Sequence, residues 1–120
     1  MKKAFITLIL SATFLFGFGQ TTLIPDPNFE QALIDLGLDV TLDGSVLTSS
    51  ISGVNLLNVS NKSISDLTGI EAFTALTNLV CHSNELTSLD VSQNTGLTLL
   101  WSEINQLTSL DVSQNTALSH

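Results

Sequence analysis

Residues Leu86–Thr95 read LTSLDVSQNT, and the same ten letters return at Leu107–Thr116, 21 positions later. A fixed period of this length is typical of a solenoid, a stack of short units in which each unit buries its apolar edge only against its neighbours. The repeated decapeptide therefore predicts a coil of stacked units. Such a coil favours a binding surface over an enclosed catalytic pocket.

The period extends beyond the identical block. Leu76–Asn84 has the spacing L-x-x-L-x-C-x-x-N, and Leu97–Asn105 repeats this spacing 21 residues on. Val54–Lys62 follows the same pattern upstream, with Lys62 in the asparagine position. Leu118 opens another copy two residues before the sequence stops. The sequence therefore contains three copies of a leucine-rich pattern and the start of a fourth, and we expect a truncated array.

Alternation within each copy predicts short parallel strands. Side chains two positions apart share one face of a strand, so Leu79 with Cys81 and Leu100 with Ser102 should point into the coil. Their neighbours in the same strands should point outward. The apolar anchors recur every 10 to 12 residues, which predicts two short extended segments per copy, joined by turns. No stretch of the repeats is long enough for an amphipathic helix.

Asparagines are expected to form the turns that follow these segments. Asn84 and Asn105 end the first pattern, and the repeated decapeptides place Asn94 and Asn115 at the corresponding position. A short amide side chain can bond backbone groups of its own unit and of the next one, which would otherwise be buried without partners. Lys62 cannot supply the acceptor half of this arrangement, so the first copy should be irregular and end-like.

One helix is predicted ahead of the repeats, at residues 27–36. Asp26 is a suitable N-cap, Pro27 fits the first helical position, and Gly37 ends the helix. An apolar stripe along this helix should cover the exposed hydrophobic edge of the first unit. The stripe comprises Phe29, Ala32, Leu33 and Leu36, and its expected contacts are Val54, Leu57 and Val59.

Residues that suggest chemistry have simpler structural interpretations. Cys81 beside His82 resembles a nucleophile with its base, but consecutive strand residues point to opposite faces, so Cys81 is interpreted as a small core residue. Asp39 and Asp43 suggest a calcium loop, but the run D-x-[DN]-x-[DN]-G is absent, which favours a solvated turn. His82 and His120 are too isolated to form a metal site. We therefore predict no catalytic residue, no metal site and no cofactor.

The first residues have the features of an export signal. Lys2 and Lys3 precede an apolar run at residues 4–18 that is short for a membrane span, and Gly19 completes a small-residue cleavage motif. We expect cleavage after Gly19, export to the exterior or cell surface, and no stable membrane insertion; an uncleaved anchor is the alternative. The remaining chain has Lys62 alone against eleven acidic residues, which excludes nucleic acid as an expected partner.

The repeated motifs resemble the leucine-rich repeats of exported bacterial proteins. LTSLDVSQNT matches units of the LTSLDVSxNTAL type, and Leu57–Ile70, LNVSNKSISDLTGI, is similar to internalin repeats. Ile24–Asp39, IPDPNFEQALIDLGLD, is similar to the amino-terminal cap of such arrays in secreted Bacteroidetes proteins. The resemblance implies a leucine-rich repeat solenoid with one capping helix. It also implies a curved binding module for proteins or glycans, with no catalytic residue.

These expectations give a signal peptide at residues 1–19, a cap at 20–53 and leucine-rich repeats at 54–120. Two functions remain open at this stage. The chain is either a non-catalytic exported module that binds a protein or glycan, or the spacer or substrate-recognition repeats of a larger secreted enzyme whose catalytic domain lies beyond residue 120.

One half of each repeat is invariant, whereas the other half differs between copies. This variation reflects either drift after duplication or a recognition face. Trp101 is the leading candidate anchor, because a solvent-facing tryptophan next to acidic groups is a suitable contact; packing against a neighbouring strand is the alternative. The outward residues of the variable half are the candidate partner contacts: Asn78, Val80, His82, Leu99, Trp101 and Glu103.

Overall fold

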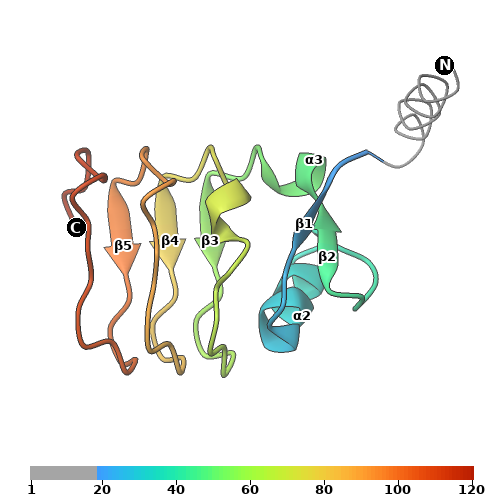
Figure 1. Cartoon of the computed structure of the whole chain (residues 1–120), viewed down its shortest axis with the longest axis horizontal. Helices are drawn as coiled ribbons and strands as arrows, with labels where there is room; N and C mark the ends of the chain where they lie inside the picture. Colours follow the sequence, from blue (N-terminus) through green and yellow to red (C-terminus); the bar gives the residue numbers. More distant parts are fainter. Residues whose placement is uncertain (1–18) are drawn as a thin grey trace, which may run out of the picture.

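The computed structural model describes residues 19–120, which form a cap followed by a coil of repeats (Figure 1). The predicted signal peptide therefore lies, except for Gly19, outside the described residues. The cap sits at one end of a row of three short strands, and the carboxyl end of the chain lies at the opposite end (Figure 1). The chain thus reads from the cap outward, one repeat after another.

The three strands form a parallel sheet with one strand per repeat. They are β3 (Leu56–Asn58), β4 (Asn78–Val80) and β5 (Leu99–Trp101), in the order β3-β4-β5. The predicted column is confirmed, because Leu57 pairs in register with Leu79, and Leu79 with Leu100. Leu57 and Leu79 are fully buried, whereas Leu100 is only partly buried.

The fourth copy begins to pair with β5. The backbone amide of Leu100 donates to the carbonyl of His120 at 2.8 Å, and the amide of Ser119 donates to the carbonyl of Thr98 at 3.0 Å. The pattern that opens at Leu118 therefore continues the coil.

The second of the two predicted extended segments in each copy does not form a strand. The only regular element there is a 3-10 turn, η1 (Ile70–Ala72), within the described part of the chain. Neighbouring copies still bond in this half, because the amide of Gln106 donates to the carbonyl of Leu86 at 2.8 Å. Leu86, Val91 and Leu97 are fully buried. The apolar anchors were therefore located correctly. In this half, however, single backbone hydrogen bonds join neighbouring turns in place of the continuous hydrogen-bond ladder of a sheet.

The cap contains more elements than the one predicted helix. They are β1 (Thr21–Leu23), α2 (Pro27–Asp35), β2 (Ser45–Leu47) and α3 (Thr48–Ile51), with β1 and β2 antiparallel. The predicted capping helix is present as α2, whereas β1, β2 and the one-turn helix α3 were not predicted, because three or four residues are too few to show a periodic pattern.

Helix α2 begins and ends through the expected residue types. Asp26 is the N-cap, and its Oδ1 accepts the amide of Asn28 at 2.8 Å. Pro27 occupies the first helical position. Leu36 is the C-cap, and Gly37 follows with a φ of +80°, a conformation that glycine adopts without steric cost. The helix is therefore one residue shorter than the predicted 27–36.

The predicted docking of Leu36 is wrong. Leu36 is 50% exposed, whereas Phe29, Ala32 and Leu33 are buried. The chain leaves the helix at Leu36 and turns back, so that the amide of Leu38 donates to the carbonyl of Leu33 at 2.9 Å. Leu38 then packs against the core in place of Leu36.

The cap and the first repeat share one hydrophobic core. Phe29 stacks with Phe73 of the first repeat, with ring centroids 6.3 Å apart. Leu57 and Val59 belong to the same buried cluster, and Val54 packs against it while partly exposed. The cap contributes two further fully buried residues that the sequence analysis did not assign, Ile24 and Ile51.

Candidate functional site

An asparagine in the turn after β4 ties two repeats together. The Oδ1 of Asn84 accepts the amides of Lys62 and Ile64, both at 3.0 Å. Its Nδ2 donates to the carbonyls of Val59 at 2.9 Å and Cys81 at 3.0 Å. Asn84 therefore bonds its own repeat, as expected, but its other partners lie in the preceding repeat and not in the next one.

Asn105 repeats this arrangement one turn later. Its Oδ1 accepts the amide of Leu86 at 2.9 Å, and its Nδ2 donates to the carbonyls of Cys81 at 3.0 Å and Ser102 at 2.9 Å. Here too the contacts run backward along the chain. The contacts run in this direction because the turn places the side-chain amide of the asparagine next to the backbone of the preceding repeat.

The asparagines of the invariant decapeptide use only half of their bonding capacity. The Nδ2 of Asn94 donates to the carbonyls of Ile70 at 2.9 Å and Phe73 at 3.1 Å. The Nδ2 of Asn115 donates to the carbonyls of Val91 and Asn94, both at 2.9 Å. The Oδ1 atoms of both asparagines are buried without a protein partner among the described residues. These residues are structural links between turns.

At the start of the coil an aspartate of the cap bonds the backbone of the first repeat. Besides capping α2, Asp26 accepts the amides of Ser65 at 2.8 Å and Asp66 at 2.9 Å through its Oδ2. Sequence reasoning assigned Asp26 only to the helix, because no local pattern connects residues 39 or 40 positions apart. The first repeat therefore makes a polar contact with the cap in addition to the shared hydrophobic core.

The outward side chains of the sheet, which alternate with the buried column, make up the candidate recognition face, called the recognition face below. The strand register aligns Asn58 with Val80 and Trp101 in one row across the sheet. Backbone bonds continue past the strand ends, from the amide of Ser83 to the carbonyl of Glu103 at 2.9 Å. Six candidate contacts lie on this face: the half-buried Asn78, Val80, His82 and Leu99, and the exposed Trp101 and Glu103.

Trp101 combines both interpretations that the sequence left open. Its side chain is 48% exposed, and its indole lies against the imidazole of His82 with ring centroids 4.5 Å apart and planes tilted by 39°. The neighbouring repeat thus supports one side of the indole while the rest faces solvent. A hollow of about 390 Å³ lies beside it, at the edge of β5. Its lining residues are Leu99, Leu100, Trp101, Ser102, Glu103 and His120.

Cys81 is a core residue. Its side chain is fully buried, and this burial raises the pKa of the thiol from 9.0 to about 12. The adjacent His82 bonds through Nδ1 to the hydroxyl of Ser83 at 3.0 Å. Because a thiolate is the reactive form of cysteine, a buried thiol with a raised pKa does not act as a nucleophile at neutral pH.

The recurring aspartates and serines form local turns. The Oδ1 of Asp90 accepts the hydroxyl of Ser92 at 2.6 Å and its amide at 3.0 Å, and Asp111 accepts the amide of Ser113 at 2.9 Å. The hydrogen bond from the Ser92 side chain lowers the pKa of Asp90, and that from the Ser113 side chain lowers the pKa of Asp111. Both pairs stabilise turns, which accounts for their recurrence.

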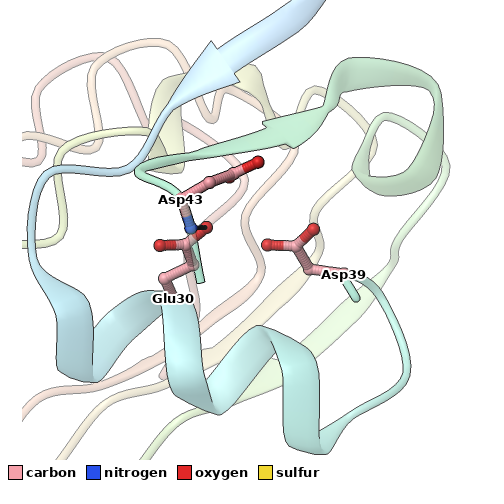
Figure 2. A group of neighbouring side chains, drawn as sticks. All are labelled: Glu30, Asp39 and Asp43. Carbon is pink, nitrogen blue, oxygen red and sulfur yellow. Dashed lines mark hydrogen bonds between the residues drawn. The ribbon is translucent and has the colours of Figure 1, made fainter. Parts of the chain in front are cut away.

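Three carboxylates meet in the cap, between α2 and the loop that precedes β2 (Figure 2). Glu30, Asp39 and Asp43 each place an oxygen within 4.8 Å of the others. Asp39 and Asp43 were candidates from the sequence alone, whereas Glu30 gave no signal beyond its position within the predicted helix. Of the described residues, these are the ones that could hold a metal ion, since carboxylate oxygens are the ligands that Ca²⁺ prefers.

Glu30 already has a structural role in this cluster. It is 1% exposed, and its two oxygens accept the amides of Asp43 at 3.0 Å and Gly44 at 2.8 Å. One oxygen of Asp39, Oδ2, is buried without a partner among the described residues. The carboxylate of Glu30 therefore holds the loop in place with charge-assisted hydrogen bonds.

Comparisons with known proteins agree with this architecture. No family model matches the chain. Internalin J of Listeria monocytogenes is 38% identical over 71 residues, which span 59% of this chain and 8% of that protein. The solved functional domain of InlJ from the same organism, which includes a cysteine ladder, has a TM-score of 0.73 and 39% identity, over 84% of this chain and 23% of that one.

A second solved structure shows the fold alone. Internalin C2 of L. monocytogenes has a TM-score of 0.74 at 21% identity, over 83% of this chain and 47% of that one. The stacked parallel strands, the asparagine turns and these neighbours define a leucine-rich repeat solenoid. More particularly, its repeats are similar to those of internalins, as its sequence motifs predicted, over a small part of those longer proteins. Among residues 19–120, no helix is both long and apolar enough to cross a membrane.

Proposed function

We propose that this chain is an exported, non-catalytic module that binds a protein or glycan through the recognition face. In this proposal residues 1–19 direct export, residues 20–53 cap the coil, and residues 54–120 present the face. The contacts are the outward side chains Asn78, Val80, His82, Leu99, Trp101 and Glu103.

The exposure of Trp101 carries the proposal. A tryptophan that is 48% exposed on a regular strand face is available to bury a large apolar area against a partner. Its position is fixed by the strand register with β4 and by the imidazole of His82. A side chain held in this way loses little conformational freedom on binding, which favours affinity.

The residues that suggest chemistry support a non-catalytic role. Cys81 is buried with a raised thiol pKa. The hydroxyl of Ser92 is bonded to Asp90 within its own turn. Each of these groups has a structural function, so the recognition face is the surface to which we assign binding.

Binding of the chain to an array of extracellular proteins and glycans tests this proposal. We expect Trp101→Ala to weaken any ligand that the wild-type chain retains by about 30-fold or more, the effect of losing about 2 kcal/mol at a central contact. Gln93→Ala, an exposed change in the invariant half of the repeat, is the matched control and should bind as the wild type. Thermal melts should show that both variants are folded. Unchanged binding by Trp101→Ala would refute the proposal.

A further inference from the structure

The recognition face carries a single formal charge. Its nine side chains form three rows that follow the strand register and the backbone bonds beyond it. They are Leu56, Asn78 and Leu99; Asn58, Val80 and Trp101; and Ser60, His82 and Glu103. With histidine neutral, Glu103 is the only charged member, and it is exposed.

Glu103 follows Trp101 by two positions, just past the end of β5, and both residues line the hollow at the edge of that strand. The backbone pairing with the preceding repeat continues to Glu103, because the amide of Ser83 donates to its carbonyl at 2.9 Å. His82 covers part of the indole, with ring centroids 4.5 Å apart, and leaves 48% of the Trp101 side chain exposed. An aromatic surface open to solvent therefore lies next to a carboxylate.

This pair has the electrostatics of a cation site. The face of an indole carries negative charge from its π-system and attracts a cation placed over it. The adjacent carboxylate adds a full negative charge and accepts hydrogen bonds from a cationic group. Residues 20–120 contain one lysine, Lys62, no arginine and eleven acidic residues. The long-range electrostatic field of this part of the chain therefore also attracts cations and repels anions.

We infer that the Trp101–Glu103 pair receives an arginine side chain of a protein partner, with the guanidinium over the indole and bonded to the carboxylate. This inference rests on the proposed function and names the class of partner. Arginine fits better than lysine, because its planar guanidinium stacks on an aromatic ring and bonds a carboxylate with two parallel donors. A glycan offers no such charge.

The test uses Trp101 as its own reporter. The chain has one tryptophan and no tyrosine, so tryptophan fluorescence reports this position alone. We expect a hexa-arginine peptide with blocked ends to give a saturable fluorescence change at low salt. A hexa-citrulline peptide, which has the same shape without the charge, should give none.

Two variants separate the pair from general attraction to an acidic chain. Glu103→Gln should weaken the hexa-arginine peptide by about 2- to 5-fold, the range expected for an exposed charge pair. Glu85→Gln removes the same charge from an exposed position beyond the Asn84 turn and should weaken it less than Glu103→Gln. Equal weakening by both variants, or an equal response to hexa-citrulline, would overturn the inference.

The two proposals fail separately. If Trp101→Ala abolishes binding on the array while hexa-arginine gives no fluorescence change, the recognition face stands and the arginine assignment is wrong. If the array retains only glycans, and Trp101→Ala loses them, the recognition face again stands and the arginine assignment is again wrong. If Trp101→Ala leaves array binding unchanged, the proposed function itself is wrong.

Discussion

Asn84→Ala tests the physical basis of the repeat stack. The asparagine is 8% exposed and makes four side-chain bonds of 3.0 Å or less. Each bond contributes about 1 kcal/mol net, and a buried backbone group left without a partner costs about 1–3 kcal/mol. Ile64 is fully buried, so its amide cannot turn to water when the asparagine oxygen is removed. We expect Asn84→Ala to lower the free energy of unfolding by about 3–4 kcal/mol.

Urea unfolding followed by Trp101 fluorescence measures this loss as a shift in the transition midpoint at constant slope. Asn78→Ala is the matched control. Asn78 is half-buried, and its side chain makes a single bond, from the Thr77 hydroxyl at 2.8 Å. We expect that variant to lose about 0.5 kcal/mol or less, as for an ordinary surface substitution. If the two variants unfold at the same urea concentration, the asparagine turns do not hold the repeats together.

Three further changes probe the cap and the core. Leu33→Ala should lower stability by about 2–5 kcal/mol because the side chain is fully buried, whereas Leu36→Ala should cost under about 1 kcal/mol; thermal melts compare them. Glu30→Gln should destabilise the cap by about 1–3 kcal/mol, because Glu30 accepts the amides of Asp43 and Gly44. Hydrogen exchange of the cap amides measures this loss, and Asp35→Asn, at an exposed position, is the control. Burial raises the pKa of the Cys81 thiol from 9.0 to about 12, so this thiol loses its proton at a lower pH in the unfolded chain than in the folded one. The free energy of unfolding should therefore fall as pH rises between these values, and Cys81→Ala should remove this pH dependence. A Leu36→Ala loss equal to that of Leu33→Ala, protection of the cap unchanged in Glu30→Gln, or the same alkaline slope in Cys81→Ala would each contradict the structure described.

The sequence predicts those features that recur with the period. The aligned column of Leu57, Leu79 and Leu100 follows from spacing alone, because each copy repeats the same alternation of inward and outward residues. The burial of Cys81 follows from the same alternation. A repeated signal is read several times, so a local irregularity does not obscure it.

Features that occur once, or that depend on distant partners, were not predictable in this way. Asp26 bonds Ser65 across 39 positions, and no periodic pattern connects them. Glu30 joins the acidic cluster only after the loop returns over the helix. Leu36 has the helical spacing of a buried residue, yet the chain turns there and exposes it. In each case tertiary geometry overrides the local pattern.

The backward direction of the asparagine contacts has a consequence for the order of folding. The amide of Ile64 has its partner only when Asn84 has been placed, and the amide of Leu86 waits in the same way for Asn105. Each new repeat therefore completes the turn laid down before it. A chain that emerges amino end first can thus close turn by turn, starting from the cap, because the amides left open in each repeat find their asparagine in the next one.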